Sequence, residues 1–82
     1  MLSQKDLLRQ LLLEAEQEST QFIPDHNTTS FDVCHHIWAS EVLKHSADPD
    51  DLTEQEAQDL ITRIRRSVIA VISHYLSVGG AL

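Results

Sequence analysis

The sequence predicts an all-α protein, a small three-helix bundle completed by homodimerisation through a long C-terminal helix. Both glycines lie near the end of the chain and both prolines in connections, which leaves three long stretches without a helix breaker. Each stretch starts with a side chain that can cap a helix. The last stretch carries more apolar residues than one face can hold. We expect one domain, residues 1–82, with helices over about 3–18, 30–45 and 53–77.

The first predicted helix begins at Ser3, whose hydroxyl can accept from the amide of Asp6 three residues later. A stripe of apolar residues then covers about 140° of the helix surface, and it consists of Leu7, Leu8, Leu11, Leu12 and Ala15. The periodicity stops at Glu18, and Pro24 disfavours helix at Ile23. We expect a connection in which Phe22 and Ile23 cover the end of the bundle.

The second predicted helix starts with Thr29 and Asp32, the spacing of a reciprocal cap. Its segment "FDVCHHIWASEVLKH" holds the only cysteine, the only tryptophan and three of the five histidines. An apolar arc around Trp38 also includes Glu41 and His45, four residues apart on one ridge. If this pair lies at a dimer interface, dimerisation depends on pH, because histidine titrates near neutrality.

The third predicted helix opens with Thr53 and Glu56, and at 1.5 Å per residue it is about 36 Å long. Its first half has a single apolar stripe, but after Ser67 apolar residues surround the helix. A helix that is apolar nearly all round is buried nearly all round. A three-helix monomer has too little material for this, so we expect a self-association surface formed by Val68, Ile69, Ile72, Tyr75 and Leu76, together with Trp38.

Cys34, Glu41 and His45 are also competent metal ligands on one side of the second helix. Zinc in a structural site takes four ligands, and the helix lacks the close cysteine or histidine pairs that chelate one ion. We therefore expect a small buried cysteine and a helical ion pair, with no metal and no cofactor. A small metal- or ligand-binding protein built on these three residues is the alternative.

Catalysis by a Cys34–histidine pair would need an orienting group and a pocket. Helical chains of 82 residues rarely build such a site, so the expected protein is not an enzyme. The start of the chain has no secretory pattern and no segment is long enough to span a bilayer. We expect a cytoplasmic protein that does not enter membranes.

A net charge of −7 repels phosphate backbones, which makes nucleic-acid binding unlikely from composition. Arg63, Arg65 and Arg66 cluster in the third helix, but they point in different directions around it. Asp59 lies one turn before Arg63 and is expected to pair with it. A nucleic-acid-associated regulator that uses the three arginines is a further alternative.

The function predicted from these features is that of an acidic, non-enzymatic protein–protein interaction module, a homodimeric regulator, adaptor or inhibitor. Its acidic faces would steer a partner protein with a basic surface.

Overall fold

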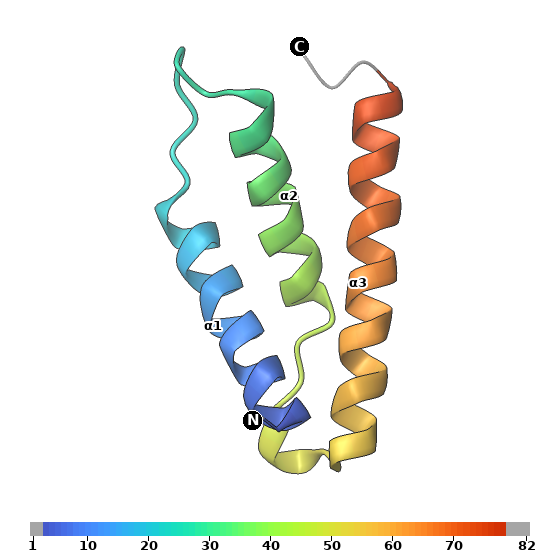
Figure 1. Ribbon diagram of the computed structural model, residues 1–82. Coiled ribbons are helices and arrows are strands. Elements are labelled where there is room, and N and C mark those ends of the chain that lie inside the picture. Colours follow the sequence, from blue (N-terminus) through green and yellow to red (C-terminus); the bar gives the residue numbers. More distant parts are fainter. Residues whose placement is uncertain (1–2, 79–82) are drawn as a thin grey trace.

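The computed structural model describes residues 3–78 and shows an all-helical chain, as predicted (Figure 1). Helix α1 spans Gln4–Gln21, α2 spans Ser30–Lys44, and α3 spans Glu54–Ser77, while a short 3₁₀ helix, η1, covers Pro49–Asp51. No strand occurs within residues 3–78. None of the helices in this range combines the length and the apolar character needed to cross a membrane.

Capping side chains set the starts of all three long helices. Thr29 and Thr53 form reciprocal caps, in which each hydroxyl accepts from the amide of Asp32 or Glu56 and each carboxylate accepts in return. Ser3 accepts from the amide of Asp6 at 3.1 Å. The Asp6 carboxylate binds Arg9 at 2.8 Å, so the first cap has only one half of the reciprocal arrangement.

A contact between distant parts of the chain completes the start of α1. The two carboxylate oxygens of Glu54, the first residue of α3, accept from the amides of Gln4 and Lys5, both at 2.9 Å. Amides in the first turn of a helix have no partner within that helix and carry partial positive charge. Glu54 therefore binds the start of α1 to the start of α3.

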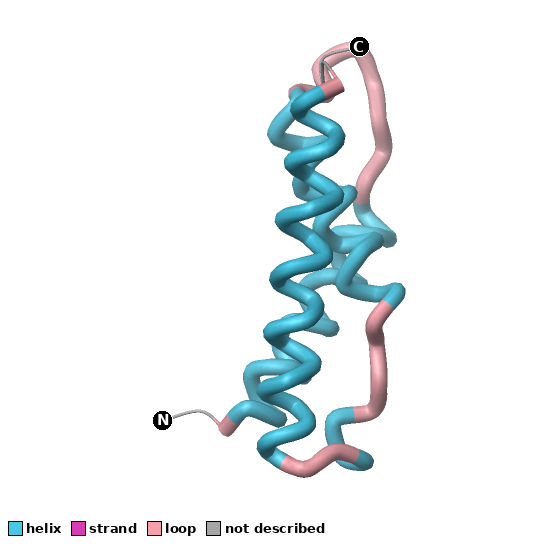
Figure 2. The backbone as a smooth tube through the Cα atoms, turned by 90° about the vertical axis from the view of Figure 1, so that its right-hand side faces the viewer, coloured by secondary structure: helices cyan, strands magenta, loops and turns pink. Residues whose placement is uncertain are grey.

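The helices form an elongated bundle in which α1 and α3 run in the same direction and α2 runs opposite to both (Figure 1). The ribbons of α1 and α3 lie close together near Glu54 and diverge toward the other end, where α3 extends beyond α1. Figure 2 shows α3 running nearly the full length of the molecule. The radius of gyration is 14.0 Å, compared with about 12 Å for a compact domain of this length.

The core lies between all three helices and is built from small and branched apolar residues. Alanines from every helix are fully buried and let the backbones approach closely. Larger side chains from each helix fill the remaining space, and the buried set is Leu8, Ala15, Ala39, Val42, Ala57, Leu60, Ile64 and Val68.

Two expectations for the first connection were wrong. Helix α1 continues to Gln21, because the polar residues after Glu18 all tolerate a solvated helix until Pro24 approaches. Ile23 is 82% exposed and covers nothing. Phe22 does pack on the bundle, with its ring stacked on His36 at a centroid distance of 4.3 Å.

Candidate interaction surface

Two flanks of α3 hold the residues that the sequence analysis singled out. On one flank Ser67 faces α2, and on the other Arg65 and Ile69 face an open groove beside α1. At 100° per residue, Ser67 and Arg65 point about 160° apart on α3. The two flanks are therefore separate sites.

On the Ser67 flank, the predicted pair of Glu41 and His45 forms, joined by a third residue. Ser67 donates to Glu41 Oε1 at 2.5 Å, and His45 Nε2 lies 3.2 Å from the Ser67 oxygen and 3.6 Å from Glu41 Oε1. Lys44 Nζ is 3.4 Å from the other carboxylate oxygen. Although Glu41 is only 7% exposed, it has partners on both oxygens.

The Ser67 hydroxyl lowers the pKa of Glu41, and Lys44 and His45 lower it further, while burial acts in the opposite direction. The ionised Glu41 carboxylate accepts a hydrogen bond from the Ser67 hydroxyl, so the hydroxyl hydrogen is directed at Glu41 and not at His45, unlike the serine of an acyl-transfer triad. The arrangement satisfies a buried charge between α2 and α3 of one chain.

The sequence analysis did not identify Ser67, although the position of this residue in the apolar pattern of α3 offered a signal. Ser67 is a small polar residue on the border of the apolar stripe of α3, between Ile64 and Val71. A polar side chain at such a position needs a buried partner. Only the relative placement of α2 and α3 identifies that partner as Glu41.

Cys34 does not join Glu41 and His45 in a metal-binding group. It is a free, half-buried thiol on α2. Within residues 3–78, no three histidine, cysteine, aspartate or glutamate side chains are placed to share a metal ion.

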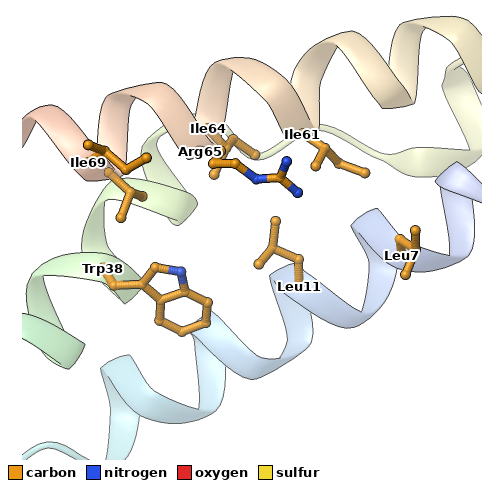
Figure 3. Close-up of a pocket in the computed structure, with 8 residues that line it drawn as sticks. Leu7, Leu11, Trp38, Ile61, Ile64, Arg65 and Ile69 are labelled. Carbon is orange, nitrogen blue, oxygen red and sulfur yellow. The ribbon is translucent and has the colours of Figure 1, made fainter.

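The other flank of α3 borders an open apolar groove with a volume of about 290 Å³ (Figure 3). Leu7 and Leu11 of α1 form one wall together with Trp38 of α2, which lies opposite Ile69, and α3 forms the second wall. Arg65 is the only charged residue among those that line it, which on α3 are Ile61, Ile64, Arg65, Val68 and Ile69. The Trp38 ring stacks on His35, 5.3 Å away.

The six predicted interface residues divide into three groups. Val68 is buried in the core and presents little surface. Ile69 and Leu76 are 60% and 55% exposed, and so are free for contact with another molecule. The remaining three, Trp38, Ile72 and Tyr75, are half-buried.

The three arginines of α3 are exposed, and none forms an ion pair within the described part of the chain. The expected pair between Asp59 and Arg63 was wrong, because Asp59 instead accepts from the Gln55 side chain at 3.0 Å. Arg63 and Arg66 lie away from the groove, whereas Arg65 borders it.

The groove therefore combines two exposed apolar side chains, Leu7 and Ile69, with one cation, Arg65, among the residues that line it. Comparison with family models, curated proteins and solved structures found no match to the chain.

Proposed function

We propose that this protein is a non-enzymatic interaction module that works as a homodimer and binds another protein. The observation that carries the proposal is the apolar face formed by α3 and the adjoining groove. Ile69 and Leu76 are exposed there, beside the half-buried Trp38 and Ile72. Contiguous exposed apolar surface of this kind is typical of interaction sites.

A second copy of the chain is the simplest partner for the apolar face, because self-association would cover Ile69 and Leu76 on both molecules at once.

The dimer leaves acidic surface for a further partner. Asp48 and Asp51 are exposed at η1, at the end of the bundle where α1 meets α3, beside Asp50, whose carboxylate pairs with Arg9. With a net charge of −7, this surface favours a protein with a basic face, and association should slow as salt increases. A regulator, adaptor or inhibitor would use such a surface.

Native mass spectrometry of the untagged protein tests the proposal, because one spectrum reports subunit number and any bound ion. The proposal predicts a dimer whose mass is that of two chains alone. A monomer would contradict the homodimer. A retained metal ion that is lost in Cys34→Ala would favour a metal-binding protein.

A second candidate is a nucleic-acid-associated regulator, and the lack of ion-pair partners for Arg63, Arg65 and Arg66 in the described chain favours it. Electrostatic contacts with phosphates are strongest at low salt. Measurable DNA or RNA binding at low salt that falls in Arg63→Ala/Arg66→Ala would support this candidate. Absence of binding under those conditions would remove it.

A further inference from the structure

The groove between α1 and α3 combines an apolar surface with one cation. Seven of the eight residues that line it are apolar, and Arg65 is the eighth. Long side chains on a helix lean toward its N-terminus. In Figure 3 the Arg65 side chain does so, and its guanidinium lies between Ile61 of α3 and Leu11 of α1. The positive charge therefore lies over the groove itself.

Arg65 has no ion-pair partner within residues 3–78, although the chain carries 13 acidic residues. No acidic side chain is among those that line the groove. A guanidinium binds a carboxylate through two parallel hydrogen bonds, and an apolar setting strengthens these bonds because less water competes for them. The groove therefore favours an anionic group beside Arg65 over a neutral or a cationic one.

The dimensions of the groove set the size of the apolar part of a ligand. Its volume is about 290 Å³. A cavity of roughly 150 Å³ holds one benzene ring, so the groove has room for about 12 non-hydrogen atoms. From Ile61 to Ile69 it runs about 12 Å along α3, at 1.5 Å per residue. A chain of about ten carbon atoms that ends in a carboxylate matches both the volume and the length.

We propose that the groove binds a small amphipathic carboxylate, of the size of a medium-chain fatty acid, with its anionic group on Arg65. The carboxylate lies where the guanidinium stands, between Ile61 and Leu11. The carbon chain then follows α3 to the end of the groove, between Trp38 and Ile69. Each methylene group that the groove buries strengthens binding by about fourfold.

This site goes beyond the proposed homodimer and does not depend on it. All eight lining residues belong to one chain, so binding is measured at low protein concentration, where the chain is monomeric. Ile69 belongs both to the groove and to the surface proposed for the dimer. Subunit number tests the homodimer and ligand titration tests the groove, so either proposal can fail while the other stands.

Titration with decanoate, followed by the fluorescence of Trp38, tests the site. This tryptophan is the only one in the chain and lines the groove. The proposal predicts saturable binding of one decanoate per chain, with a dissociation constant of about 10–100 µM. Decyltrimethylammonium carries the same chain on a cation and should bind at least about tenfold more weakly. Hexanoate should also bind at least about tenfold more weakly, because it buries four fewer methylene groups.

Substitution of the arginine separates the charge from the apolar contacts. Arg65→Gln should weaken decanoate binding about tenfold, because it removes the charged donor. The same variant should bind 1-decanol within about twofold of the wild type, since that probe carries no charge. Arg66→Gln is the matched control, because Arg66 lies away from the groove and should not affect decanoate binding. Circular dichroism should show unchanged helicity for both variants, because both arginines are exposed.

Methyl NMR locates the bound decanoate. The signals of Leu11, Ile61 and Ile69 should shift, whereas that of Ile23 should not, because it is 82% exposed but lies outside the groove. Equal shifts at Ile23, equal binding of the decyl cation, or tight binding by Arg65→Gln would overturn the proposal. Loss of helicity during the titration would overturn it too, because the probe would then be acting as a denaturing surfactant. Absence of binding would leave the groove to a second copy or to another protein, and would equally overturn it.

Discussion

The two flanks of α3 differ in how far their side chains are buried and paired within the chain. On the flank that faces α2, Ser67 meets Glu41 and His45, and both carboxylate oxygens have partners. On the flank that faces the groove, Ile69 is 60% exposed and Arg65 has no ion-pair partner in the described chain. One helix is therefore a core element on one side and leaves apolar side chains uncovered on the other.

The difference follows from the directions of the neighbouring helices. Helix α2 packs against α3 in the opposite direction and seals the Ser67 flank, whereas α1 diverges from α3 above their joined starts (Figure 1). The same apolar composition on α3 thus contributes to folding where a helix covers it, and remains available for association where none does.

The largest expected effect is on the free energy of unfolding, when one isoleucine of α3 is replaced on the core side and one on the groove side. Ile64→Ala, at a site only 2% exposed, should lower the free energy of unfolding by about 3 kcal/mol because it leaves a cavity. Ile69→Ala should lower it by less than about 0.5 kcal/mol. Urea denaturation at low protein concentration, where the chain is monomeric, measures both values. Equal losses would contradict the distinction between the flanks.

Ser67→Ala tests the sealed flank through its polar contacts. It removes the hydroxyl donor of Glu41 and leaves the buried carboxylate with weaker partners, which should cost about 2 kcal/mol of unfolding free energy. Glu41→Leu/Ser67→Ala removes both polar groups and should recover part of the loss. Urea denaturation checks both, and a neutral Ser67→Ala would show that the hydroxyl does not stabilise the carboxylate.

Glu54→Ala tests the contact that holds the starts of α1 and α3 together. It leaves the amides of Gln4 and Lys5 to water and should lower the free energy of unfolding by about 1 kcal/mol. Gln55→Ala is the matched control, because Gln55 contacts only its own helix. Hydrogen exchange should report faster opening of the first turn of α1 in Glu54→Ala alone.

The smallest effect concerns the dependence of stability on pH. The pKa of Glu41 is lowered in the folded chain, first by the Ser67 hydroxyl, so its contribution is present above the ordinary value of about 4.3. That contribution is lost as the pH falls through the folded-state pKa. The stability difference between wild type and Glu41→Gln should therefore shrink below about pH 4.3.

Asp32 also has a lowered pKa, because the amide and hydroxyl of Thr29 bind its carboxylate. The pH comparison is therefore made in an Asp32→Asn background, so that only Glu41 differs between the two proteins. Urea denaturation at a series of pH values measures the difference. A difference that stays constant through the acid range would show that Glu41 is not held ionised by the fold.

Features that depend on neighbours in sequence were predictable, and those that depend on helix placement were not. The caps at Thr29 and Thr53 and the pair of Glu41 and His45 each join residues within one or two turns. The contact of Glu54 with the start of α1 spans 50 residues in sequence for the Gln4 amide, and no local pattern identifies it.

The candidate surface was predicted in part for the same reason. Excess apolar residues after Ser67 indicated an uncovered face, and the exposure of Ile69 and Leu76 agrees with that indication. Sequence periodicity could not show that Val68 belongs to the core and not to the uncovered face. The structure buries Val68 in the core. Nor could it show that Leu7 and Leu11 belong to this surface, because they join it only through the position of α1 beside α3.

Sedimentation equilibrium of the wild type and of Ile69→Asp, from micromolar to millimolar concentration, tests the central claim most directly. Ile69 is the chosen site because it is 60% exposed, so an aspartate there should leave the single chain folded. Ile72 packs against the core, and an aspartate there would also destabilise the fold. The account predicts a wild-type dimer and a helical, monomeric Ile69→Asp. A monomeric wild type, or an Ile69→Asp protein that dimerises as tightly as the wild type, would contradict it.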